Sequence, residues 1–276
     1  TLFPYTTLFR SEMLERKRQE LAVYRQADLV IAVTEEDRDV LLREDSALNI
    51  GVLPNIHNIP TLPDDLESRK VSGRITFVGN FANNLSNVDA MQWFCKEVLP
   101  QVLAEVPTAH LMIVGNAPPA EVQALSGPTI TVTGYVPETE PYLLESEISI
   151  CPLRFGAGLK GKIGEAMMYG LPVVTTTIGT QGMDAIHGDN MMVGDSPNEF
   201  AKGVVALLKD PQLRAQMAKK GRQFIIDNYS YEAVRQKVDS MLREIDVAPI
   251  RGYGKAERKA RLWARHLKDR LKWRLN

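Results

Sequence analysis

The sequence contains only two cysteines, Cys95 and Cys151, which excludes a disulfide framework and a cysteine-based metal cluster. Both lie in apolar runs, so we expect buried free thiols, which fit a reducing cytoplasm. No run reaches the ~18–20 apolar residues that a transmembrane helix needs. The start of the chain also lacks the charged and then apolar pattern of a signal peptide. These absences predict a globular protein in the cytoplasm.

The net charge is also small, at -1, because an acidic segment and a basic segment of the chain nearly cancel. Residues 249–276 contain ten Lys and Arg against two Asp and Glu, whereas the preceding 248 residues contain 23 against 32. Residues 255–275 fit one amphipathic helix that could lie on an anionic membrane, giving a peripheral location on the inner face of the cell membrane. The alternatives are a helix packed on the body or a flexible tail. The acidic body lacks an aromatic and basic surface pattern, so nucleic acid is not an expected partner.

The chain divides by composition into five segments. Residues 1–11 resemble translated adapter or cloning sequence, and we set them aside from fold reasoning as non-native or disordered. Residues 12–57 contain two short candidate strands and a helix over 35–44 behind the candidate cap Thr34. Two strands are too few for a doubly wound domain, so this segment is predicted to be the remnant of an N-terminal acceptor domain. The proline-containing linker, the main domain and the basic tail are placed at 58–73, 74–246 and 247–276.

From Arg74 onward, short apolar runs alternate with helical patterns. The runs are nearly continuous, as in strands that are buried on both faces of a parallel sheet. This order predicts an α/β fold with a Rossmann-like doubly wound parallel sheet, closed by helices over 196–246. The expected strands are 75–79, 110–115, 129–133, 148–152, 172–176 and 191–193, and the expected helices between them are 87–105, 119–126, 139–146 and 162–170.

In such sheets ligands bind beyond the carboxyl ends of the strands. Two turns there carry weak signals. Gly79 and Asn80 follow the first strand and precede a helix, whose N-terminus favours an anion. Gly134 ends the third strand, and Val136 exposes backbone groups before the next helix. The first turn by itself is equally explained as a tight strand-to-helix connection, and the second is only a weak signal by itself.

The strongest signal is the segment 151–183, where a strand, a glycine-rich loop and a helix follow one another. Its glycines free backbone N–H groups to face an anion. Its lysines offer point charges for a diphosphate, and Glu165, expected in the first turn of the helix, can accept hydrogen bonds from ribose hydroxyls. Taken singly, Glu165 could instead compensate the helix dipole, and the lysines could lie in a solvated loop. The glycines and cations of the loop are Gly156, Gly158, Gly161, Arg154, Lys160 and Lys162.

The segment GAGLKGKIGEAMMYGLPVV resembles the signature region of retaining GT-B glycosyltransferases of family four, also called group 1. FVGNFANNLSNVDAMQWFCKEVLP resembles the first strand, loop and helix of their C-terminal domain. TGYVPETEPYL and QGM resemble further landmarks in the same order, and the resemblance covers about residues 20–246. It implies a C-terminal domain that holds a nucleotide sugar and an N-terminal domain that supplies most of the acceptor site.

The resemblance also implies roles for individual residues. Glu165 would be the second glutamate of a Glu-x7-Glu motif and would bind the donor ribose. Lys162 would neutralise the diphosphate and stabilise the leaving group, so Lys162 and Glu165 are the predicted catalytic groups. Gly79 and Asn80 would lie at the diphosphate. The other predicted donor-binding residues are Gly134, Tyr135, Val136, Arg154, Phe155, Gly156, Gly158, Leu159 and Lys160.

One departure from the pattern concerns Ala157, which stands where the first glutamate of the motif is expected. That glutamate normally contacts the donor sugar, so the identity of the sugar stays open. The scheme needs no cofactor and no metal, and its donor is a UDP- or GDP-sugar. The expected acceptor is a glycan or lipid-linked glycan, as in polysaccharide biosynthesis.

Three functions therefore remain for this sequence. The first is a retaining glycosyltransferase of hexosyltransferase type, of which this chain is an incomplete piece. The second is a non-catalytic nucleotide-sugar-binding fragment or degenerate homologue. The third is a GT-B-fold sugar-nucleotide epimerase, which would require catalytic acids in the cleft that the sequence does not reveal.

Overall fold

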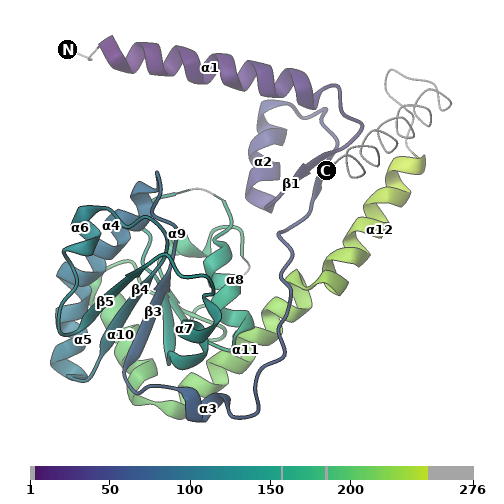
Figure 1. Ribbon diagram of the computed structural model, residues 1–276. Coiled ribbons are helices and arrows are strands. Elements are labelled where there is room, and N and C mark those ends of the chain that lie inside the picture. Colours follow the sequence, from purple (N-terminus) through teal and green to yellow (C-terminus); the bar gives the residue numbers. More distant parts are fainter. Residues whose placement is uncertain (1–3, 157, 184–185, 248–276) are drawn as a thin grey trace, which may run out of the picture. The chain divides into compact units, whose positions relative to one another are not determined.

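The computed structural model describes residues 4–156, 158–183 and 186–247 (Figure 1). The predicted membrane helix over 255–275 lies outside these residues. The chain divides into two compact units, which are described separately below. The smaller unit joins Thr1–Leu53 with Lys237–Asn276, and the larger is Pro54–Gln236.

The smaller unit contains a pair of parallel strands between helices. Strands β1 (Val30–Ala32) and β2 (Ile50–Val52) pair in parallel, with Val30 opposite Ile50. Helix α1 (Pro4–Tyr24) precedes them and includes residues 4–11, which belong to the segment predicted to be non-native or disordered. Helix α12 (Tyr231–Val247), the last one in the described part of the chain, returns to this unit. Its Met241 side chain covers Gly51 so closely that a Cβ atom on Gly51 would meet the Met241 sulfur at 3.0 Å.

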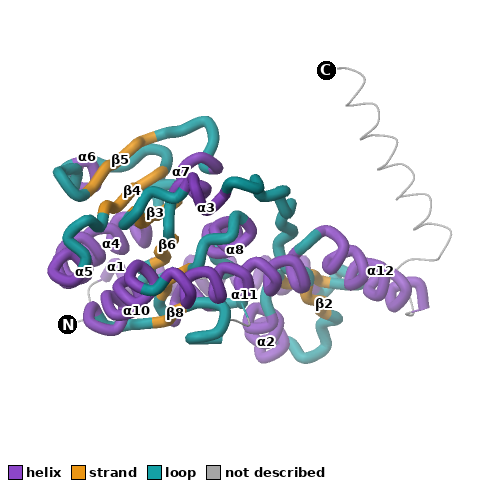
Figure 2. The backbone as a smooth tube through the Cα atoms, turned by 90° about the horizontal axis from the view of Figure 1, so that it is seen from below, coloured by secondary structure: helices purple, strands orange, loops and turns teal. Residues whose placement is uncertain are grey.

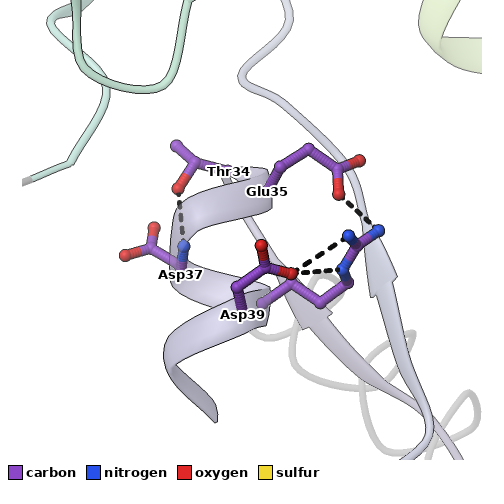
Figure 3. A network of polar contacts seen from close by, with 5 residues as sticks. Thr34, Glu35, Asp37 and Asp39 are labelled. Carbon is purple, nitrogen blue, oxygen red and sulfur yellow. Dashed lines mark hydrogen bonds and ion pairs between the residues drawn. The ribbon is translucent and has the colours of Figure 1, made fainter. Parts of the chain in front are cut away.

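Helix α2 (Glu35–Glu44) starts where Thr34 predicts it (Figure 3). The Thr34 hydroxyl accepts a hydrogen bond from the backbone N–H of Asp37 at 3.0 Å, which satisfies one of the donors that a helix N-terminus leaves unpaired. Arg38 forms ion pairs with Glu35 and with Asp39 on the same helix. The cap that was inferred from the sequence is therefore confirmed.

The larger unit is built on six parallel strands in the order β5-β4-β3-β6-β7-β8. This order confirms the predicted doubly wound sheet. Phe77, Ile113 and Ile150 are among the fully buried side chains of its core. The strands are β3 (Arg74–Val78), β4 (His110–Val114), β5 (Ile130–Gly134), β6 (Ile148–Cys151), β7 (Val173–Thr175) and β8 (Met192–Val193).

Helices cover both faces of this sheet (Figure 2). One layer contains α4, α5 and α10, and the other contains α7 and α8, with α11 packed on α8. Asp210 ends α10 and caps α11, so the predicted boundary at Asp210-Pro211 is confirmed. The bounds are α4 (Leu85–Trp93), α5 (Leu99–Glu105), α6 (Ala120–Gln123), α7 (Glu140–Glu145), α8 (Gly161–Met168), α10 (Pro197–Lys209) and α11 (Pro211–Tyr229).

Three details differ from the sequence predictions. The helix expected over 87–105 is interrupted by a π-helical segment, Phe94–Val98, in which the Leu99 N–H bonds to the Phe94 carbonyl. Pro100 follows directly, and its missing N–H favours such an irregularity.

A short helix, α3 (Leu66–Arg69), forms inside the predicted linker, and another, α9 (Thr177–Thr180), follows β7. Cys151 is buried as expected, whereas Cys95 is only half-buried, and both thiols are free.

A buried ion pair lies at the edge of the sheet where the strands begin. Glu147, just before β6, pairs with Arg214 of α11 at 2.9 Å, and their side chains are only 10% and 15% exposed. The Glu147 carboxylate also accepts a hydrogen bond from the backbone N–H of Gly73 at 2.7 Å. This one side chain therefore joins the start of β3, the start of β6 and helix α11.

Candidate functional site

The order of the strands locates the crevice in which a ligand can bind. The chain runs from β3 outward to β4 and β5, and then returns to the other side of β3 to form β6. Ligands of open α/β sheets bind at the carboxyl ends of the two strands where the direction of winding reverses. These two strands are β3 and β6, so the loops after them, 79–84 and 152–160, form the candidate site.

The loop after β3 is compact and leads into the N-terminus of α4. The backbone of Gly115, after β4, comes so close that an added Cβ atom would lie 1.7 Å from the Gly79 carbonyl oxygen, which makes a side chain at Gly115 impossible without a shift. Asn84 caps α4 by accepting a hydrogen bond from the Asn87 N–H at 3.2 Å. The first turn of α4 therefore faces the crevice as an anion-favouring helix N-terminus.

The loop after β6 contains two glycines in the left-handed region, Gly156 with φ +131° and Gly158 with φ +73°. Lys160 is buried, and its ammonium donates to the Gly158 carbonyl at 2.5 Å, which contradicts the alternative of a solvated loop lysine. A Cβ atom on Gly156 would lie 3.8 Å from the Ser86 hydroxyl, so this loop approaches α4. Ala157 lies outside the described residues.

Lys162, in the first turn of α8, connects the two loops. Its ammonium donates to the Asn87 side-chain oxygen at 2.6 Å and lies 4.3 Å from the centre of the Phe77 ring. Burial lowers the pKa of Lys162, and the nearby charge of Lys160 acts in the same direction. Asn87 in turn donates to the Asn80 carbonyl at 2.7 Å. Lys162 and Asn80 are thus brought together through Asn87.

Glu165 lies in the second turn of α8, which corrects the prediction that it lies in the first. The helix already begins at Gly161, and the helix dipole acts mainly within the first turn, so dipole compensation explains Glu165 less well. Its carboxylate accepts a hydrogen bond from the Thr139 hydroxyl at 2.6 Å. This contact draws the connection after β5 toward α8.

His57 packs against the same helix. A Cβ atom on Gly164 would come within 2.4 Å of the His57 ring, so only glycine leaves room for this contact. Burial lowers the pKa of His57, and the nearby Glu165 carboxylate opposes that effect. The His57 backbone N–H also bonds to the Tyr229 carbonyl at 2.8 Å.

The remaining predicted residues are distributed around the crevice. Arg154 is turned toward α4, where it pairs with Asp89 through a 2.9 Å hydrogen bond and lies 6.0 Å from the centre of the Trp93 ring. Its charge is therefore already compensated within the protein. Tyr135 is 73% exposed and Phe155 is 48% exposed, so both carry solvent-accessible aromatic surface.

Sequence reasoning did not identify three polar or aromatic partners of the site, namely Asn87, Thr139 and Phe77. An asparagine on the buried side of α4 was the one available signal, because buried polar side chains need specific partners. Among the described residues, no group of three or more His, Cys, Asp and Glu side chains could hold a metal ion. The geometry therefore offers backbone N–H groups, two lysines and a carboxylate, a set that suits a phosphorylated ligand carrying hydroxyl groups.

The fold is that of a Rossmann-like domain of the GT-B type. The chain belongs to the family described as glycosyl transferases group 1, whose sequence model matches residues 72–210, about half of the chain. It is 30% identical over 170 residues to an uncharacterized 44.6 kDa protein in the cps region of Klebsiella pneumoniae, covering 58% of this chain and 43% of that protein. The chain thus spans less than half the length of this curated relative.

Solved structures share the fold at low sequence identity. A mutant of TarM from S. aureus, in complex with Fondaparinux, alpha-GlcNAc-glycerol and UDP, matches with TM-score 0.68 and 18% identity over 79% of this chain and 44% of its own. A sucrose-phosphate synthase from Thermosynechococcus elongatus matches with TM-score 0.65 and 21% identity over 83% and 61%. Anabaena Alr3699/HepE, in complex with UDP and glucose, matches with TM-score 0.63 and 18% identity over 80% and 64%.

None of the helices in the described part of the chain has the length and apolar character needed to cross a bilayer.

Proposed function

We propose that this chain is the donor-binding half of a retaining, family-four glycosyltransferase that uses a nucleoside-diphosphate sugar. The observation that carries the proposal is the placement of Lys162. Its ammonium is held between the Asn87 amide and the Phe77 ring, beside the β3–β6 switch point and two helix N-termini. A diphosphate is the ligand whose charge and size suit this position.

In this proposal different residues of the site bind the diphosphate, the ribose and the base of the ligand. Lys162 and Lys160 balance the diphosphate, with Gly79 and Asn80 at the phosphates, and Lys162 stabilises the negative charge that develops on the leaving group. Glu165, oriented by Thr139, accepts hydrogen bonds from the ribose hydroxyls. The exposed Tyr135, with Val136 beside it, borders the base.

The neighbours support a nucleotide-sugar donor. UDP is bound in the TarM and HepE complexes, which favours a UDP-sugar over a GDP-sugar for this chain. We propose a glycan or lipid-linked glycan as the acceptor, a role in polysaccharide biosynthesis, and action in the cytoplasm.

The smaller unit supports a role in a larger acceptor domain. Strands of parallel sheets are normally buried on both faces. In β1, however, Ile31 is 53% exposed between two buried neighbours. We propose that residues 12–57 form part of an acceptor domain whose further elements would cover this strand.

The first test of the proposal is nucleotide binding. In a calorimetric panel of UDP, GDP and ADP with their sugars, at least one diphosphate should bind, and more tightly than its monophosphate, because Lys162 and Lys160 add charge at the second phosphate. Absence of binding by every nucleotide contradicts the proposal. Transfer of the sugar in a protein that carries a complete acceptor domain then separates a transferase from a non-catalytic binding protein.

Glu165 provides a separate prediction about the ribose. Replacing it with alanine removes hydrogen bonds to a charged group, so the affinity for the bound nucleotide should fall by roughly 1.5–3 kcal/mol. The 2′-deoxy nucleotide is the informative control, because it already lacks one of these bonds and should lose less in the variant. Equal losses for the ribo- and deoxyribonucleotide would assign Glu165 to the stability of α8 instead.

A further inference from the structure

Asn87 is a buried polar side chain with both ends of its amide engaged. It is 3% exposed in the first turn of α4. Its NH₂ group donates to the Asn80 carbonyl at 2.7 Å, and its oxygen accepts from the Lys162 ammonium at 2.6 Å. The opposite orientation of the amide would set NH₂ against the ammonium and oxygen against the carbonyl. The two partners therefore dictate a single orientation.

The surroundings of Lys162 are uncharged at the points of contact. Asn87 offers a neutral oxygen, and Phe77 offers the face of its ring at 4.3 Å. A carboxylate in place of the amide would hold the ammonium more firmly but would cancel its charge. A neutral acceptor fixes the position of the ammonium and leaves its charge, with its remaining donors, for an anion in the crevice.

We propose that Asn87 is a positioning residue that orients Lys162 toward the phosphates and links it to Asn80 on the loop after β3. The inference rests on the proposed function, because it assigns Asn87 a task in the same diphosphate site. Being buried, Asn87 acts through its two partners and not by touching the ligand. Its contribution should therefore appear in the recognition of the second phosphate.

The Asn87→Asp variant tests this directly, since the two side chains have nearly the same shape. The new carboxylate pairs with Lys162 and offers no donor to the Asn80 carbonyl. We expect the affinity for UDP to fall about tenfold or more, the range typical of a lost charge-assisted contact, while the affinity for UMP changes less. The measured quantity is the ratio of the UMP and UDP dissociation constants, with GMP and GDP as a second pair.

Asn83→Asp is the matched control. Asn83 is exposed on the loop after β3, and its backbone φ of +53° is one that aspartate also tolerates. This variant adds the same charge near the crevice without a carboxylate at Lys162. It should change the UMP to UDP ratio less than Asn87→Asp does, and an equal change would reduce the effect to general electrostatics and overturn the inference.

A double-mutant cycle then asks whether Asn87 acts through Lys162. In the Lys162→Met background, Asn87→Asp should change the UMP to UDP ratio much less than in the wild type, because only the hydrogen bond to the Asn80 carbonyl is then left to lose. Fully additive losses would show independent roles and refute the inference. Thermal unfolding monitors the fold, and Asn87→Ala enters the same cycle if the aspartate variant does not fold. A wild-type protein that binds no nucleotide would refute the proposed function, whereas tight UDP binding with an unchanged ratio would refute only the role of Asn87.

Discussion

The Lys162→Met variant should bind UDP roughly ten- to 150-fold more weakly than the wild type, which corresponds to about 1.5–3 kcal/mol for a hydrogen bond to a charged group. Methionine has a similar length, and its thioether packs favourably against an aromatic ring. The contact with Phe77 should therefore be kept while the charge is lost. Isothermal titration calorimetry with UDP and UMP measures the effect, and the loss should be larger for UDP.

The pH dependence of UDP binding is a second test of the role of the Lys162 charge. Burial lowers the pKa of Lys162 in the free protein. A bound diphosphate favours the charged form and raises that pKa, so binding should take up a proton once the pH exceeds the value in the free protein. The affinity of the wild type for UDP should then decrease at alkaline pH, and the Met variant should lack this part of the decrease. Identical pH profiles, or equal affinities, would remove Lys162 from the phosphate site.

The largest effect on stability is expected at Glu147, far from the crevice. Glu147→Ala leaves Arg214 buried without its ion-pair partner, and it deprives the Gly73 N–H of an acceptor. Removing one member of a buried pair typically costs about 3–5 kcal/mol. For a domain of this size, that loss lowers the melting temperature by roughly 6–20 °C. Differential scanning calorimetry measures the change.

Glu105→Ala is the control for Glu147. Glu105 forms a 2.7 Å ion pair with Lys209, but these side chains are 61% and 50% exposed. Exposed pairs contribute little, since water screens both charges whether or not they are paired. The melting temperature should therefore barely change. A similar small change for Glu147→Ala would show that the Glu147–Arg214 pair does not hold β3, β6 and α11 together.

Local patterns were sufficient to predict most of the framework. Nearly continuous apolar runs identified all six strands of the large sheet, because strands buried on both faces carry few polar residues. Thr34 and Asp210 marked helix boundaries, because capping depends on neighbours only two or three residues away. The break in the helix at Phe94–Val98 was missed, although Pro100 directly after it was a local signal for an irregularity, because proline lacks the N–H that a continuous helix needs.

The candidate site divides in the same way between local pattern and tertiary contact. By itself, the sequence determined the doubly wound parallel class of the fold and the placement of Gly79, Asn80, Lys162 and Glu165 near the carboxyl ends of the strands. Only the tertiary structure decided which partners hold these side chains. Asn87 is 75 residues from Lys162, Thr139 is 26 residues from Glu165, and Arg154 is drawn to Asp89. Such bonds join segments that are distant along the chain, so no periodic pattern in the sequence predicts them. Burial and helix capping, by contrast, follow from the types of neighbouring residues.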